Sequence, residues 1–218
     1  MAGRPKTGEV IKNVLGYSLS YPCVTRWNSF FDAVRKILNG KSKMEELFLK
    51  LNLQKLTDIE LAYLEEYCEL MAPIANALDL LHGDKYCYLG YVLPTIFTIR
   101  TKFVKLEISG KINILHELIF KLTSALQSRF NSLFELEVKA QMHIIAAILC
   151  PDVKPRWLPT AKKINKKFDI DLVYNTITNS IYSNDASVQS SVSTLETNSF
   201  FDFDEQGFIT HTHIMIYF

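Results

Sequence analysis

The Arg26-Trp27 pair is the first place in this chain where residue types and spacing could do chemistry. An arginine guanidinium can grip a phosphate, and a tryptophan ring can stack on an unpaired base. The pair follows the extended-looking stretch 21–24 and precedes a helix-type apolar pattern, and exposed side chains at such junctions are often functional. A plainer interpretation is a helix start with Asn28 or Ser29 as the N-cap and Trp27 packed as a hydrophobic staple.

A second arginine–tryptophan pair, Arg156-Trp157, lies in the proline-punctuated stretch 151–159, which we interpret as a rigid loop. Six cations fall within the fourteen positions from 154 to 167: Lys154, Arg156, Lys162, Lys163, Lys166 and Lys167. Clusters of this kind bind phosphates as point charges. A solvated helix face gives the same count, so both interpretations stay open.

Other catalytic and metal-binding chemistry has no pattern in the sequence. No pair among the five histidines has the i, i+4 spacing with an intervening Glu that a helical zinc protease needs, and His211 and His213 lack a third ligand. There is no GxSxG motif and no glycine-rich phosphate loop. The acidic side chains fall mostly on helix faces that we expect to be solvated, including Glu60, Glu65, Glu66 and Glu69. We therefore expect no metal site, no cofactor and no active site.

Size and charge are typical of a folded protein with an uneven charge distribution. The chain has 218 residues, of which 48% are hydrophobic and 22% charged, enough to bury a core. Residues 1–168 carry all 24 Lys and Arg and 16 acids, a net charge of +8, whereas residues 169–218 carry seven acids and no Lys or Arg. A basic body suits a polyanion partner.

Several absences indicate an intracellular location. The four cysteines are singly spaced, which predicts buried free thiols rather than disulfides or a zinc finger. No apolar run approaches the ~18 residues that span a bilayer, and residues 1–9 lack a signal-peptide core. We expect no membrane partner.

The elements that would position the candidate residues are mostly helical. Alternating apolar residues predict one strand over 14–24. Helical patterns follow over 29–38, 42–52, 57–82, 94–106, 112–130 and 135–149. Asn39-Gly40 is a stop signal, Thr57 and Glu60 form a capping box, and Pro94 suits a first helical turn.

The resulting fold class is mainly α: an antiparallel helical bundle with one or two short N-terminal strands and an irregular C-terminal tail. We predict a polar extension without periodicity over 1–13, a helical domain over 14–168, and an acidic tail over 169–218. The Ser/Asn/Thr-rich stretch 175–197 is typical of a linker or a disordered segment, and the last apolar residues have no evident partners.

Five stretches in order resemble the hAT-superfamily DNA transposases and their domesticated relatives with a BED zinc finger. They are YPCVTRWNSF (21–30), LTD followed by YLEEYCELMAPI (56–58 and 63–74), ALDLLHGDKY (77–86), YVLP (91–94) and AAILCPDVKPRWL (146–158). Together they span about residues 15–168. The resemblance implies the end of the first part of an RNase H-like core, followed by the family's helical insertion, with Arg26 and Trp27 close to DNA.

The resemblance also implies that catalytic parts are missing. The family's first two catalytic aspartates would precede Met1, and no Ser-Glu-Arg block that would supply the third acid occurs in 169–218. We therefore expect a catalytically inactive transposase-derived fragment in the nucleus, with residual DNA binding through Arg26, Trp27 and the 154–167 cations. Other transposase-like proteins are expected as further partners. The alternative is a helical protein-interaction scaffold without nucleic-acid binding, based on the acidic face at 60–69.

Overall fold

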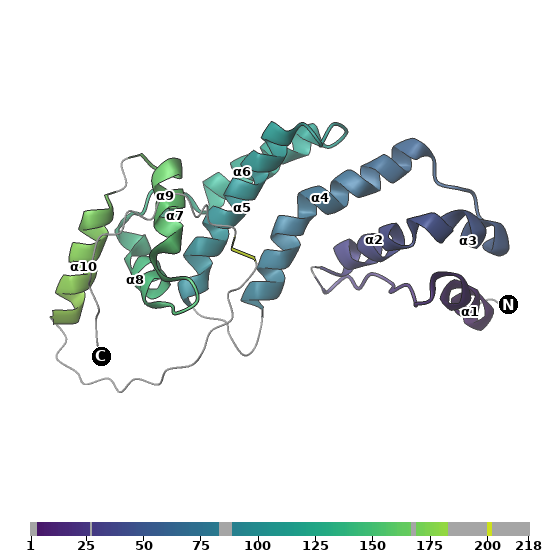
Figure 1. Ribbon diagram of the computed structural model, residues 1–218, viewed down its shortest axis with the longest axis horizontal. Helices are drawn as coiled ribbons and strands as arrows, with labels where there is room; N and C mark the ends of the chain where they lie inside the picture. The colour runs from purple at the N-terminus through teal and green to yellow at the C-terminus, as the bar shows by residue number, and fades with distance from the viewer. Residues whose placement is uncertain (1–3, 27, 83–88, 167–168, 183–199, 202–218) are drawn as a thin grey trace. The chain divides into compact units, whose positions relative to one another are not determined.

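The computed structural model describes residues 4–26, 28–82, 89–166, 169–182 and 200–201, and over these ranges the protein is mainly α, as predicted (Figure 1). The helices are α1 (Arg4–Leu15), α2 (Ser29–Asn39), α3 (Met44–Leu51), α4 (Asp58–Leu81), α5 (Leu89–Ser109), α6 (His116–Arg129), α7 (Asn131–Phe134), α8 (Gln141–Leu149), α9 (Leu158–Ile164) and α10 (Ile170–Tyr182). Short 3-10 helices cover Lys41–Lys43, Val138–Ala140 and Lys154–Trp157. No strand occurs in the ranges described.

The chain divides into two compact units. Unit 1 contains Met1–Leu78 and Phe103–Lys121, and unit 2 contains Asp79–Lys102 and Leu122–Phe218. Helices α1 to α3 and most of α4 therefore belong to unit 1, whereas α7 to α10 belong to unit 2. Both units draw on the stretch 14–168 that the sequence pattern assigned to one domain.

The strand predicted over 14–24 is wrong. Helix α1 continues to Leu15, and irregular chain follows it to Cys23. The alternation itself is real, because Leu15, Tyr17 and Leu19 all pack against the same apolar cluster. No neighbouring strand is present in the described part of unit 1 to pair with this segment. Its apolar side chains are therefore buried without any β-sheet hydrogen bonding.

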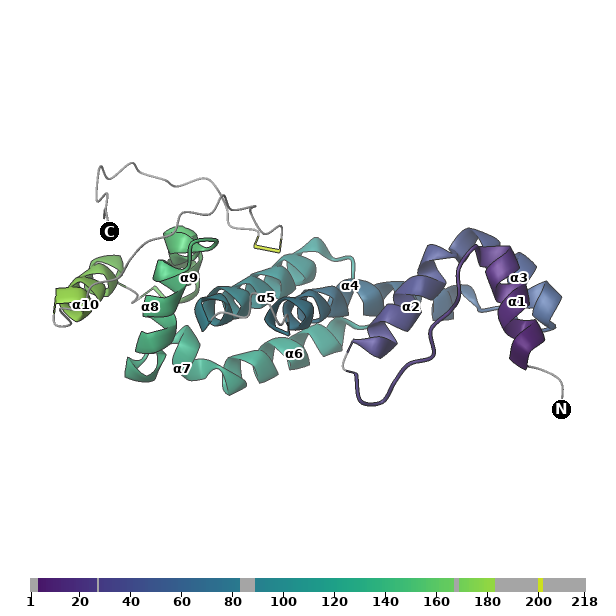
Figure 2. The same cartoon turned by 90° about the horizontal axis from the view of Figure 1, so that it is seen from below.

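The N-terminal segment is more structured than its composition indicated. Residues 4–15 form α1, although 1–13 was expected to be a polar extension without periodicity. Val10, Ile11 and Val14 turn toward α3, where Met44 and Leu47 are buried with them. Figures 1 and 2 show α1 lying alongside α3. This small cluster supplies the packing that stabilises a short helix of low intrinsic propensity.

Two local signals in unit 1 are confirmed. Helix α2 ends at Asn39, and the Gly40 amide donates to the carbonyl of Ile37 at 3.0 Å. The capping box forms in both directions: the Thr57 amide donates to a Glu60 carboxylate oxygen at 2.8 Å, and the Glu60 amide donates to the Thr57 hydroxyl at 3.2 Å. Helix α4 therefore starts where its cap predicts.

The expected solvated acidic stripe on α4 is only partly correct. Glu65 and Glu69 are exposed and pair with Lys41 and Lys111 at 2.6 and 3.6 Å. Glu66, in contrast, is only 9% exposed. It lies on the buried face of α4 because Leu70, Pro73 and Ala77 follow it at spacings of four, three and four residues.

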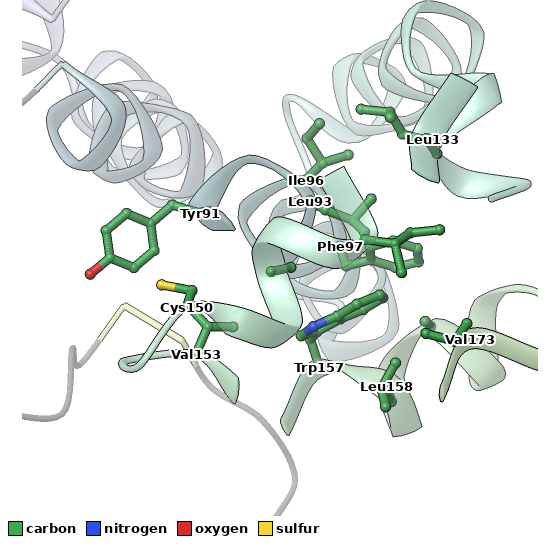
Figure 3. Packing of buried hydrophobic residues seen from close by; sticks show 14 of the residues in the cluster. Tyr91, Leu93, Ile96, Phe97, Leu133, Cys150, Val153, Trp157, Leu158 and Val173 are labelled. Carbon is green, nitrogen blue, oxygen red and sulfur yellow. The ribbon is translucent and has the colours of Figure 1, made fainter. Parts of the chain in front are cut away.

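Unit 2 is built around a large apolar cluster (Figure 3). Trp157 is fully buried, and its ring lies 5.9 Å from that of Phe97 on α5, which in turn meets Phe134 edge-on at 5.4 Å. Gly90 permits close packing between α5 and α8, since a Cβ atom there would lie 2.4 Å from the Ala146 carbonyl oxygen. Tight helix contacts of this kind require a missing side chain.

Several boundaries in unit 2 differ from prediction. Helix α5 begins at Leu89, so Pro94 lies inside it rather than in its first turn. The helix expected from residue 135 begins at Gln141, because Leu136 has a left-handed backbone (φ 51°) and Glu137 is extended. The stretch 151–159 is not a loop, since a 3-10 helix and the start of α9 occupy much of it.

The start of the acidic tail is helical. Residues 170–182 form α10, with Val173 and Ile177 in the main cluster, although part of this stretch was expected to be linker. Phe200 and Phe201, expected to have no partners, also pack on unit 2: Phe201 stacks with Tyr91 at 5.8 Å. The remainder of the predicted linker and the apolar C-terminus lie outside the described residues.

Candidate nucleic-acid interface

A tight loop presents Arg26 just before α2. The single proton of the Ser29 hydroxyl is shared between the carbonyl oxygens of Cys23 and Arg26, at 2.6 and 2.8 Å, and the hydroxyl oxygen accepts the Cys23 amide at 3.0 Å. These bonds close the loop from 23 to 29 on itself. The Arg26 side chain is exposed, whereas Trp27 lies outside the described residues.

Asn28 does not cap α2 with its side chain. Its amide nitrogen instead donates to the carbonyl of Ala75 on α4 at 2.8 Å. The Ser29 hydroxyl bonds to carbonyl groups of the loop. Neither of the two expected N-cap residues therefore caps α2 with a side-chain hydrogen bond. The loop that carries Arg26 is therefore fixed both to α4, through Asn28, and to the start of α2, through Ser29.

Cys23 gives this loop a reactive character that sequence reasoning missed. The thiol is exposed rather than buried, and its sulfur lies 3.1 Å from the Thr25 hydroxyl. Hydrogen bonds from Thr25, through its hydroxyl and then its backbone, lower the pKa of Cys23, and Arg26 contributes a smaller effect of the same sign. Cys68 and Cys150 behave oppositely, because burial raises the pKa of each thiol.

The lysines of the 154–167 cluster that the structure describes are presented by α9. Leu158 and Ala161 are buried, which turns the opposite side of this short helix to solvent. Lys163 is exposed on that side, Lys162 is exposed at the edge of the buried side, one turn after Leu158, and Lys166 is exposed just after the helix ends. Lys167 and the side chain of Lys154 lie outside what the structure describes.

Arg156 has a local structural role. Its Nε donates to the carbonyl oxygen of Val153 at 3.2 Å, and its Nη2 donates to that of Asp152. These bonds fold the guanidinium back onto the turn that precedes Trp157. In this conformation Arg156 is a cap on its own chain, and a phosphate would have to compete with two carbonyl groups.

The predicted site residues fall in two separate groups. Arg26 belongs to unit 1, and the cations of 154–166 belong to unit 2. Without the acidic stretch 169–218, unit 2 is the more basic of the two: its segments 79–102 and 122–168 carry 11 cationic and 5 acidic side chains, a net charge of +6. The corresponding net charge of unit 1 is +2, from 13 cationic and 11 acidic side chains.

A cation outside both groups was not singled out from the sequence. Lys102 on α5 lies over the ring of Phe200, with its Nζ 4.6 Å from the ring centroid, and it donates to the Phe200 carbonyl at 3.2 Å. The two residues are 98 positions apart. No periodicity or motif could have joined them, because the contact depends on the tertiary fold.

Within the described ranges there is no group of three or more His, Cys, Asp or Glu side chains arranged to hold a metal ion. None of the helices described has the length and apolar character needed to cross a bilayer.

In comparisons with known proteins, no family model, no curated protein and no solved structure matches the chain.

Proposed function

We propose that this protein is a catalytically inactive, transposase-derived helical module that binds DNA through electrostatic contacts. The observation that carries the proposal is a pair of exposed lysines at the end of α9: Lys162 lies in its last turn, and Lys166 follows four residues later, just beyond the helix. The +6 charge of the surrounding part of unit 2 supports a polyanion partner. The ordered resemblance to hAT transposases supports DNA as that polyanion.

Arg26 is proposed as a second, independent contact. Its loop is closed by Ser29 and fixed to α4 by Asn28, so the guanidinium starts from a defined backbone position. Preorganisation of this kind lowers the entropic cost of gripping a phosphate. Trp27, next to it in the sequence, would supply base stacking.

The decisive experiment measures DNA affinity against salt. Fluorescence anisotropy with labelled single-stranded and hairpin-ended DNA is recorded for the wild type and for Lys162→Ala/Lys166→Ala. The variant should bind more weakly, with a salt slope reduced by about 0.7 per lost phosphate contact on single strands. The matched control is Lys50→Ala/Lys55→Ala, which removes the same charge from two exposed lysines already paired with Glu46 and Glu45.

Two outcomes would count against parts of the proposal. Equal loss of affinity in both double variants would show a response to net charge alone, without an interface on α9. Binding by Arg26→Ala/Trp27→Ala at wild-type affinity would remove the proposed role of that pair. Mg²⁺-dependent DNA cleavage by the purified chain would contradict the assignment of an inactive module.

A protein-interaction scaffold is the second candidate. Exposed apolar side chains at the α3–α4 corner, including Leu49, Leu53 and Ile59, support it. The acidic face of α4 supports it less than expected, because Glu65 and Glu69 are paired and Glu66 is buried. A complex held by apolar contacts should survive a rise in salt that dissociates DNA.

A further inference from the structure

Phe200 and Phe201 pack on unit 2, whose segments 79–102 and 122–168 carry a net charge of +6. Phe200 is only 8% exposed, and Phe201 packs against the main cluster of unit 2. The two rings meet edge-on at 5.4 Å, and Phe201 also stacks on Tyr91. Lys102 contacts Phe200 twice, because its Nζ lies over the ring and also donates to the carbonyl oxygen. The pair is thus held by both apolar and cationic contacts.

This anchor brings negative charge with it. Asp202, Asp204 and Glu205 follow Phe201 directly in the sequence. Covalent geometry keeps the Cα atom of Glu205 within roughly 15 Å of that of Phe201. Charges farther apart than the Debye length, about 8 Å at physiological salt, are largely screened, so these carboxylates compete only for cations close to them.

The distribution of charge within unit 2 indicates which part of the chain could compete with DNA for its cations. Residues 79–102 and 122–168 carry +6, and the segment from Phe200 onward carries three acids, Asp202, Asp204 and Glu205, without any Lys or Arg. A chain that docks its own acidic end on its basic body raises the effective concentration of that end far above that of a free competitor. Phosphates and carboxylates would compete for the same lysines.

We propose that Phe200 and Phe201 form an intramolecular anchor that holds the acidic end of the chain on unit 2 as a competitor of DNA. The inference rests on the proposed function and adds a regulation to it. The docking surface is the part of α5 that carries Tyr91 and Lys102, and its occupant is the segment of this chain that begins at Phe200. DNA binding then requires displacement of the acidic end.

The docking itself is tested without DNA. Chymotrypsin cleaves after aromatic residues, and cleavage of the full chain after Phe200 and Phe201 is followed by mass spectrometry. Lys102→Met keeps a side chain of similar length but removes the cation, and it should accelerate cleavage at these two positions several-fold. Lys105→Met, three residues after Lys102 along α5 and already in the other unit, serves as the matched control and should leave the rates unchanged. Equal rates in the wild type and Lys102→Met would overturn the anchor.

The competition is tested by DNA affinity in the full chain. Phe200→Ala/Phe201→Ala should bind labelled single-stranded DNA about tenfold more tightly than wild type at low salt, and the difference should shrink as salt rises. Asp202→Asn/Asp204→Asn/Glu205→Gln, which keeps both aromatic rings, should also bind more tightly. Phe120→Ala removes an exposed phenylalanine of unit 1 (71% exposed) and should bind as wild type.

The outcomes separate the two proposals. Wild-type affinity in both the aromatic and the acidic variants would overturn the competition and leave DNA binding standing. No binding by any variant would overturn DNA binding and the competition together, and the cleavage rates would then decide the anchor alone. Tighter binding by both variants, with Phe120→Ala unchanged, supports the anchor as a cis competitor.

Discussion

The carboxylate of Glu66 on α4 accepts the backbone N–H of Leu115, just before α6, at 2.9 Å. The same carboxylate accepts the amides of Asn113 and Ile114 at 2.9 and 3.1 Å. Three consecutive N–H groups therefore converge on one buried side chain, an arrangement that favours negative charge. Burial alone would raise the pKa of Glu66, but the three hydrogen bonds together lower it below the ordinary value.

Replacement of Glu66 should destabilise unit 1. Glu66→Gln keeps the size but turns an amide group toward N–H donors, so the free energy of unfolding should fall by roughly 2–4 kcal/mol. Urea unfolding followed by circular dichroism measures the change. Glu65→Gln, the neighbouring exposed residue paired with Lys41, should cost about 0–1 kcal/mol. Similar losses in the two variants would mean that the buried contact has no special weight.

The same contact predicts the direction of pH dependence. The pKa of Glu66 is lower in the folded than in the unfolded chain, so its contribution is fully present above the unfolded value of about 4.5 and is lost as the pH falls through the folded value. The stability difference between wild type and Glu66→Gln should therefore be constant near neutral pH and shrink below about pH 4.5. A difference that grows in acid would contradict this sign.

Gly90 should not accept a side chain. Gly90→Ala places a Cβ atom 2.4 Å from the carbonyl oxygen of Ala146 and 2.7 Å from the Cβ atom of Cys150, so α5 and α8 must separate. Such overpacking costs about 1–3 kcal/mol. Gly8→Ala in α1 meets no atom within 4 Å and should instead stabilise by about 0.5–1 kcal/mol through helix propensity. The urea midpoints of the two variants should move in opposite directions.

The capping box at the start of α4 offers a smaller, local test. Thr57→Ala removes the acceptor of the Glu60 amide and should cost about 1 kcal/mol. Thr57→Ser keeps the hydroxyl and should cost much less. Amide hydrogen exchange reports the effect directly, since fraying should raise exchange in the first turn of α4. Equal exchange in the Ala and Ser variants would show that the hydroxyl contributes nothing.

Cys23 should be the most reactive thiol among the cysteines that the structure describes. Its lowered pKa gives more thiolate at neutral pH, whereas burial raises the pKa of Cys68 and Cys150. Alkylation mapped by mass spectrometry should label Cys23 first. Thr25→Val should slow its labelling, and Thr25→Ser should preserve the rate. No difference between these two variants would exclude the hydroxyl as the cause.

Local chemistry was readable from the sequence, and long-range contacts were not. The Thr57–Glu60 box and the Gly40 stop depend on residues within a few positions, and both are confirmed. The prediction of a strand at 14–24 was wrong because alternating apolar residues indicate only which side chains are buried. They do not indicate whether a second strand is available to pair with the segment. Glu66 could have been placed on the buried face from its spacing to Leu70 and Pro73, but its donors lie 47 to 49 positions away.

The candidate interface shows the same division. The spacing of Leu158 and Ala161 predicts the buried face of α9 and the exposure of Lys163 opposite it, whereas Lys162 lies one turn after Leu158, so its exposure depends on tertiary packing. The Arg156 guanidinium bonds to the backbone of the turn at Asp152. Sequence composition could not distinguish this structural role of Arg156 from the exposure of the neighbouring cations. The transposase resemblance and its nuclear, DNA-binding implications stay predictions.

The bond from Asn28 to the Ala75 carbonyl has a consequence for shortened versions of this protein. A fragment that stops before α4 would keep the Ser29 closure but lose the fixed point that orients the arginine loop. Expression trials that trim the chain to its most basic N-terminal helices would therefore discard the geometry they intend to study. The smallest fragment of unit 1 that keeps this hydrogen bond extends past residue 75.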